Sequence, residues 1–389
     1  MSGNKGENGR LGLGPFRPLG RKDGRKGPSP NRPNNRSKGA RIAWIEWARA
    51  LGACGVVLLH VFVSTSLATE FVPARAVVYT ALGIVLGRWA VPAFFMITGL
   101  LLMDPTRQVG WRQVGRYALR MVGVLATYGL AFAVMEEAWA SIRDGAGLSP
   151  LVLWRSVVDV LSASTWDHLW YVYALLGVYL CVPALRALRD RLGHRGFGAL
   201  ASALFLGVLV IPTFLHLFAL VMGGEVFVPA QGLAALPQNL VVGITCFCVG
   251  GCLERLPMRW PVIACGAVSL ATMLCVSLWG IFAGLGDCGF VFLQGSCFAC
   301  AYAVFVLVLL RRLVGSGTID ADSPIARLAR DSFGVYVLHP LFVHVVLLGV
   351  GPGVLPSPLF EVALFVVSMV GSIALTHAMR HVPRLGTLL

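Results

Sequence analysis

Long, uninterrupted apolar runs dominate the sequence from Trp47 to its end. Most of them hold about 20 residues, the length at which a helix spans the hydrocarbon core of a bilayer. Hydrophobic residues make up 57% of the chain and charged residues only 13%, whereas about 25% of the residues in a soluble domain are charged. A soluble fold of 389 residues could not bury so much apolar surface, so the sequence excludes a soluble enzyme.

The apolar runs predict an all-α integral membrane protein, a bundle of about ten transmembrane helices. Strands of a membrane β-barrel would alternate apolar and polar residues, and these runs do not. A helix also satisfies its own backbone hydrogen bonds in lipid. We expect helices over residues 47–68, 79–103, 117–138, 167–185, 197–221, 237–253, 261–283, 289–310, 333–350 and 358–379.

Basic residues gather in every second connection between these helices. With the N-terminus in the cytoplasm, the inner segments hold 27 of the 32 Lys and Arg residues, and the outer segments hold only Arg75, Arg143 and Arg155. Cytoplasmic segments of membrane proteins carry such an excess of positive charge. The distribution predicts a multi-pass protein of the cell membrane with both termini in the cytoplasm.

Residues 1–41 differ from the rest of the chain. They hold 11 basic residues against Glu7 and Asp23, and they are rich in Gly, Pro and Asn. This composition predicts a disordered basic cytoplasmic tail, followed by a membrane domain over residues 42–389. A basic arm could contact nucleic acid or anionic lipid. We expect instead that its positive charge keeps the N-terminus in the cytoplasm, and we expect no nucleic-acid partner.

The ten cysteines show no pattern of a metal site or a disulfide framework. Seven of them lie within apolar runs, where cysteine acts as a small hydrophobic residue. No Cys and His spacing matches a zinc site. We therefore expect no metal.

The first expected helix carries polar residues on one stripe. Glu46 and Arg49 are three residues apart and can pair. Arg49 and His60 are eleven residues apart, so they share a face and lie about 16 Å apart along the axis. Taken singly, Arg49 could be an interfacial arginine that reaches out of the membrane, and His60 a core histidine bonded to another helix. Their alignment favours a functional stripe.

Other polar residues fall inside later helices. Arg88 lies within the second expected helix, where an ionisable side chain is costly and indicates a functional site, or else a structural ion pair. We expect Arg88 at the same depth as His60. His168 opens the fourth expected helix, and Tyr336 and His339 share a face of the ninth.

These segments resemble the acyltransferase-3 family of multi-spanning membrane acyltransferases. The first helix of the family carries an acidic residue, an arginine and a histidine, which match Glu46, Arg49 and His60, although Asp is commoner at the first position. The second pattern, Arg-x-x-Val-Pro-x-Phe-Phe-Met-Ile-Ser-Gly, matches residues 88–99 with Thr98 in place of Ser. Two further patterns match residues 168–171 and 334–340.

The resemblance implies transfer of an acyl group from acyl-CoA, commonly acetyl-CoA, to a hydroxyl of a cell-envelope glycan or a lipid-linked acceptor. It implies His60 as general base or acyl carrier, Arg88 as partner of a phosphate or an oxyanion, and Arg49 as a ligand of CoA. Glu46, beside Arg49, is expected as a catalytic residue together with His60 and Arg88. Further expected site residues are the weakly matched Arg116 and Arg120 for CoA, and Tyr336, His339 and His168 as second choices.

Two other classes of function compete with this interpretation. A small-molecule transporter would also have polar residues along an intramembrane pathway, but no inverted repeat is visible in the sequence. A non-catalytic scaffold would not explain why Arg49, Arg88 and His60 lie inside apolar runs.

Overall fold

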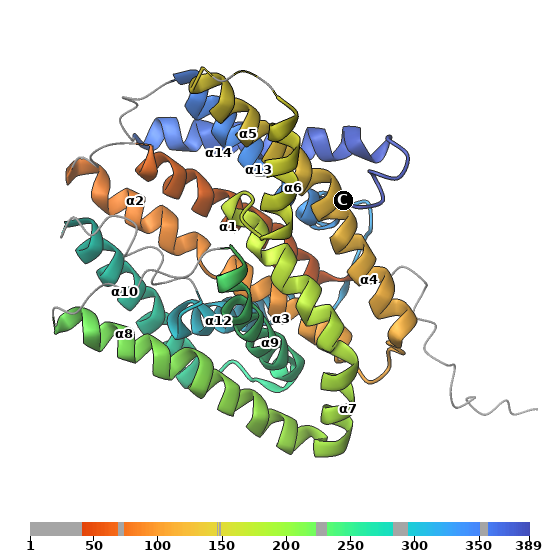
Figure 1. Ribbon diagram of the computed structural model, residues 1–389. Coiled ribbons are helices and arrows are strands. Elements are labelled where there is room, and N and C mark those ends of the chain that lie inside the picture. Colours follow the sequence, from red (N-terminus) through yellow and green to blue (C-terminus); the bar gives the residue numbers. More distant parts are fainter. Residues whose placement is uncertain are drawn as a thin grey trace, which may run out of the picture. The chain divides into compact units, whose positions relative to one another are not determined.

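The computed structural model describes residues 41–68, 74–145, 147, 149–222, 232–282, 295–350 and 357–389. The expected tail, residues 1–41, lies outside this part of the chain except for Arg41. Within it the fold is almost entirely helical, and nine helical stretches are long and apolar enough to cross a membrane. The all-α membrane bundle expected from the apolar runs is therefore confirmed (Figure 1).

The first half of the fold runs from the N-terminal helix to the longest helical stretch. A two-residue strand opens it and pairs antiparallel with residues 318–319, so that Arg41 faces Ile319. The elements are β1 (Arg41–Ile42), α1 (Ala43–Leu67), α2 (Ala74–Gly87), α3 (Ala90–Leu102), α4 (Trp111–Val124), the π-helical η1 (Leu125–Gly129), α5 (Leu130–Arg143), α6 (Pro150–Leu161), the 3-10 turn η2 (Asp167–Leu169), α7 (Trp170–Leu204), the π-helical η3 (Phe205–Val210) and α8 (Ile211–Val221).

The second half contains the helices that pack back onto α1 and α3. Its elements are η4 (Gly232–Ala235), α9 (Leu236–Cys252), η5 (Leu253–Arg255), α10 (Trp260–Phe282), α12 (Cys297–Val314), β2 (Thr318–Ile319), α13 (Pro324–Val350) and α14 (Pro358–Arg380). The start of the expected helix 289–310 lies outside the described residues.

Two expected helices, 167–185 and 197–221, follow one another without a long loop in the stretch from α7 to α8. The backbone leaves helical geometry inside this stretch at Gly193, with φ of 63°. Glycine adopts such a positive φ without steric cost. The ribbon changes direction between α7 and α8, as expected of two separate spans (Figure 1).

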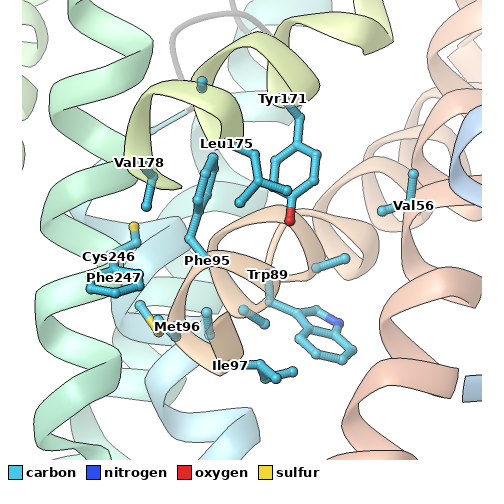
Figure 2. Packing of buried hydrophobic residues seen from close by; sticks show 14 of the residues in the cluster. Val56, Trp89, Phe95, Met96, Ile97, Tyr171, Leu175, Val178, Cys246 and Phe247 are labelled. Atoms are coloured by element: carbon cyan, nitrogen blue, oxygen red, sulfur yellow. The ribbon is translucent and has the colours of Figure 1, made fainter. Parts of the chain in front are cut away.

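The core lies where α3 packs directly against α9. A methyl group on Gly99 would lie 1.9 Å from the carbonyl oxygen of Phe247, so the two backbones touch. Phe95, Met96 and Phe247 are fully buried around this contact, and Figure 2 shows them together with Cys246, Val178 and Leu175. The contact fixes α3, and with it the arginine-bearing turns at both of its ends.

Candidate active site

Three histidine rings from three distant segments meet inside the bundle. They are His60 of α1, His168 of η2 and His339 of α13. The ring centroids lie 4.8 Å apart for His60 and His339, 5.7 Å for His168 and His339, and 6.4 Å for His60 and His168. The structure thus brings the expected base together with two of the second-choice residues.

Main-chain carbonyls determine which nitrogen of each ring carries the proton. Nδ1 of His60 lies 2.8 Å from the carbonyl oxygen of Val56. A carbonyl oxygen only accepts hydrogen bonds, so Nδ1 is the protonated nitrogen and Nε2 keeps its lone pair. The same argument leaves Nε2 of His339 unprotonated, because its Nδ1 lies 2.9 Å from the carbonyl of Tyr336. His60 is therefore prepared to accept a proton at Nε2.

A proline and a tyrosine hold this arrangement together. Pro340 has no N–H to donate to the carbonyl of Tyr336, as a regular helix would require. The Nδ1–H of His339 bonds to that carbonyl instead. The hydroxyl of Tyr336 donates to the carbonyl of His168, and Nε2 of His168 lies 3.2 Å from the carbonyl of Val337. Helix α13 and the turn before α7 are thereby tied to each other.

Only one of the three rings can be reached from outside the cluster. His168 is 4% exposed and His339 is fully buried, whereas His60 keeps an intermediate exposure. Of the three histidines, His60 is therefore the one that keeps accessible surface.

Arg88 lies at a break in the second span. The helix expected over 79–103 is one candidate span in the structure, Ala76–Leu102, but a two-residue turn divides it, because α2 ends at Gly87 and α3 begins at Ala90. Pro92 explains the break, since it lacks the N–H that would bond to the carbonyl of Arg88. The Arg88 side chain is buried, with 5% of its surface exposed.

The depth of Arg88 follows from the packing of its neighbour. A methyl group on Gly87 would lie 2.4 Å from the carbonyl oxygen of Gly55 and 2.7 Å from Cβ of Leu59. Residue 88 therefore lies at the level of the turn of α1 that carries His60. This position agrees with the expected common depth of Arg88 and His60.

A cavity of about 370 Å³ lies beside the histidine cluster. Binding sites for small molecules have volumes of roughly 300–1,000 Å³. Three arginines line it, Arg49, Arg107 and Arg120, and its wall includes Tyr336, the residue that bonds to His168. The other lining residues are Phe94, Ile97, Thr98, Leu101, Leu102, Tyr117, Met121, Tyr171, Leu175, Tyr179, Ser332 and Phe333.

Glu46 lies at the arginine end of α1 and not at the histidines. Its carboxylate is 2.9 Å from Arg41 and 3.6 Å from Arg49. His60 is fourteen residues further along the same helix, about 21 Å away at 1.5 Å per residue. This position does not allow Glu46 to touch the atoms that react at His60, and its contacts indicate that it orients Arg49.

The two weakly matched arginines differ in their surroundings. Arg120 lines the cavity, donates to the carbonyls of Leu388 and Leu389 at 2.9 and 2.8 Å, and stacks over the ring of Phe333 at 5.1 Å. Arg116 is exposed and does not line the cavity. Of the pair, only Arg120 is placed to meet a ligand there.

Arg107 also lines the cavity, although no motif in the sequence pointed to it. Its Nε lies 3.8 Å from the carboxylate of Asp104. Partial burial raises the pKa of Asp104, but hydrogen bonds from Thr106 and the charges of Arg107 and Arg186 outweigh burial and leave the pKa below its usual value. The sequence feature that could have identified Arg107 is an acidic residue, Asp104, three positions before it and directly after the second apolar run.

The three histidines do not form a metal site. Within the ranges that the structure describes, no group of three or more His, Cys, Asp or Glu side chains has the geometry to hold a metal ion. In each of the three rings one nitrogen bonds to a main-chain carbonyl.

Comparison with known proteins identifies the family. A family model described as an acyltransferase domain, Acyl_transf_3, matches residues 42–377. No curated protein and no solved structure gives a significant match. Because the matched region covers most of the chain and includes every site residue discussed above, this multi-pass membrane protein belongs to the acyltransferase-3 family and is an acyltransferase.

Proposed function

We propose that the protein transfers an acyl group, in the first place acetyl, from acyl-CoA to a hydroxyl of a cell-envelope glycan or a lipid-linked acceptor. The observation that carries the proposal is that Tyr336 connects the arginine-lined cavity with the histidine cluster. Tyr336 lines the arginine-bearing cavity, and its hydroxyl bonds to His168 in the histidine cluster. A donor with anionic phosphates at one end and a thioester at the other fits such a site.

The arginines suit the phosphates of CoA. A guanidinium presents a planar fork of donors that matches phosphate oxygens. Arg49, Arg107 and Arg120 line one cavity, and Glu46 steadies Arg49 through its ion pair. The pantetheine arm would extend past Tyr171 and Tyr336 toward His60.

His60 is proposed as the general base. Its Nε2 accepts the proton of the acceptor hydroxyl as the oxygen attacks the thioester carbonyl. The tetrahedral intermediate then collapses, the C–S bond breaks, and the protonated His60 returns its proton to the CoA thiolate. The reaction yields an O-acyl ester and free CoA, and His60 ends in its starting state.

Arg88 is proposed to stabilise the oxyanion of this intermediate. Its guanidinium is buried and lies at the level of His60. A fixed positive charge in a water-poor site stabilises developing negative charge far better than the same charge in bulk water.

The arrangement also supports a reaction in which the donor and the acceptor approach from opposite sides of the membrane. The positive-inside distribution of arginines predicts that the cavity faces the cytoplasm, where acyl-CoA is made. The acceptor would then reach His60 from the other side of the cell membrane. Both termini are cytoplasmic in this scheme.

The proposal is tested with purified protein, radiolabelled acetyl-CoA and an extract of envelope glycans and lipids. We expect CoA release that depends on the extract, together with label in a glycan or lipid fraction. Label that stays entirely on CoA would overturn the proposal and favour a transporter. Mass spectrometry of the labelled fraction then identifies the acceptor.

A further inference from the structure

One arginine outside the cavity holds the loop that carries Arg107. Arg186, in α7, donates hydrogen bonds to three main-chain carbonyls of this loop, those of Leu102, Asp104 at 3.2 Å and Arg107 at 2.6 Å. The carbonyl of Leu102 belongs to the last residue of α3, where a helix leaves its C=O groups without internal partners, and those of Asp104 and Arg107 follow the helix. A guanidinium, with five donors in one plane, can satisfy several of them at once.

The side chains within the loop complete the hold on Arg107. One carboxylate oxygen of Asp104 accepts hydrogen bonds from the amide and the hydroxyl of Thr106, at 2.8 and 2.7 Å. The other oxygen lies 3.8 Å from Nε of Arg107. Arg107 is thus held at its carbonyl by Arg186 and at its side chain by Asp104.

This hold matters because Arg107 is half exposed. Its side chain keeps 50% of its accessible surface. An arginine this exposed can adopt many rotamers. An arginine that must meet a phosphate loses side-chain entropy on binding. A mobile loop would add a loss of backbone entropy, and a main chain that is fixed in advance avoids this second cost.

We propose that Arg186 is a positioning residue for the donor: by clamping the main chain of residues 102–107, it directs Arg107 into the cavity to bind a phosphate of acyl-CoA. Arg186 does not line the cavity itself, so it acts through Arg107. The identity of the anion rests on the proposed function, whereas the clamp rests on the hydrogen bonds alone.

The chain offers a matched control. Arg311, near the end of α12, donates to the carbonyls of Leu253 at 2.8 Å and of Leu256, just after the end of α9. The chemistry of this second clamp is the same, but neither Arg311 nor the two leucines line the cavity. A general loss of stability would affect both variants, and loss of donor positioning only one.

Two measurements test the inference on full-length protein that elutes as a single species in detergent. The first is the rate of trypsin cleavage after Arg107, which reports loop opening without any assumption about the substrate. We expect faster cleavage there in Arg186→Ala than in wild type or Arg311→Ala. The second is the kinetics with acetyl-CoA. We expect Arg186→Ala to raise KM about tenfold with little change in kcat, because the lost contact to phosphate is equally strong in the ground state and in the transition state.

The double variant Arg107→Ala/Arg186→Ala decides whether Arg186 acts through Arg107. Residues that act as a unit are not additive, so its KM should equal that of Arg107→Ala alone. An equal rise in KM in both backgrounds would overturn the inference, as would faster cleavage without a change in KM. Arg186→Lys, which keeps the charge but not the fork of donors, replaces Arg186→Ala if the latter does not fold. Absence of acetyl-CoA turnover by wild type would refute the proposed donor, and the cleavage rates would still test the clamp.

Discussion

The imidazole of His339 lies 4.8 Å from that of His60, although the two residues come from α13 and α1, near opposite ends of the described chain. Each ring bonds through Nδ1 to a carbonyl of its own helix. Each therefore directs an unprotonated Nε2 away from its own backbone. The pair joins the first and the penultimate described helix around one proton-accepting centre.

Tyr336→Phe should lower kcat about tenfold and leave the KM for acetyl-CoA within about twofold of wild type. The substitution removes the hydrogen bond to the carbonyl of His168 and thereby loosens the cluster, but it leaves the arginines in place. Tyr302→Phe is the control, since Tyr302 is buried in α12 away from the cavity. Equal kinetics for the two variants would show that the bond to His168 has no part in the reaction.

Arg49→Ala should raise the KM for acetyl-CoA more than it lowers kcat, because contacts to phosphate persist through the reaction. Glu46→Gln should cause a smaller rise, since it removes the ion pair that orients Arg49 but not the guanidinium. Arg312→Ala, at an exposed position of α12, serves as the control. A fall in kcat alone would assign Arg49 to the transition state or to the fold.

Gly99→Ala should destabilise the protein severely. The added methyl group would lie 1.9 Å from the carbonyl oxygen of Phe247, and α3 and α9 would have to separate. Gly115→Ala in α4 meets nothing within 4 Å and should stabilise its helix by roughly 0.5–1 kcal/mol. Thermal unfolding in detergent distinguishes the two. A melting temperature for Gly99→Ala equal to that of wild type would contradict the close packing of α3 on α9.

Deletion of residues 2–38 should leave acetyl transfer in detergent nearly intact. These residues lie outside the described part of the chain, and their sequence contains no catalytic pattern. The measurement is turnover per purified molecule, with the Arg49→Ala variant as a reference for impaired donor binding. A large loss of activity would mean that the tail takes part in donor binding or assembly.

The sequence predicted the bundle because each span is an apolar run long enough to cross the membrane. It did not predict the break at Arg88, because Pro92 is compatible both with a kinked helix and with an interrupted one. It did separate the expected helices 167–185 and 197–221, and helical geometry is interrupted between them at Gly193.

The site was predictable only in part. The stripe of Glu46, Arg49 and His60 follows from helical spacing within one segment. The meeting of His60, His168 and His339 depends on how three segments pack, and no spacing within one of them records it. Arg107 was missed for the same reason, because its place in the cavity depends on a clamp from α7.

The most direct test of the account compares His60→Ala with His344→Ala in acetyl transfer from acetyl-CoA. Both histidines bond through Nδ1 to a carbonyl four residues back in their own helix, each at 2.8 Å. His344 is exposed and lies outside the three-histidine cluster. With both variants eluting as folded protein, we expect His60→Ala to lose acetyl transfer by at least about 100-fold, as removal of a general base does, and His344→Ala to retain the wild-type rate. Wild-type turnover by folded His60→Ala would contradict the central claim that His60 is the base.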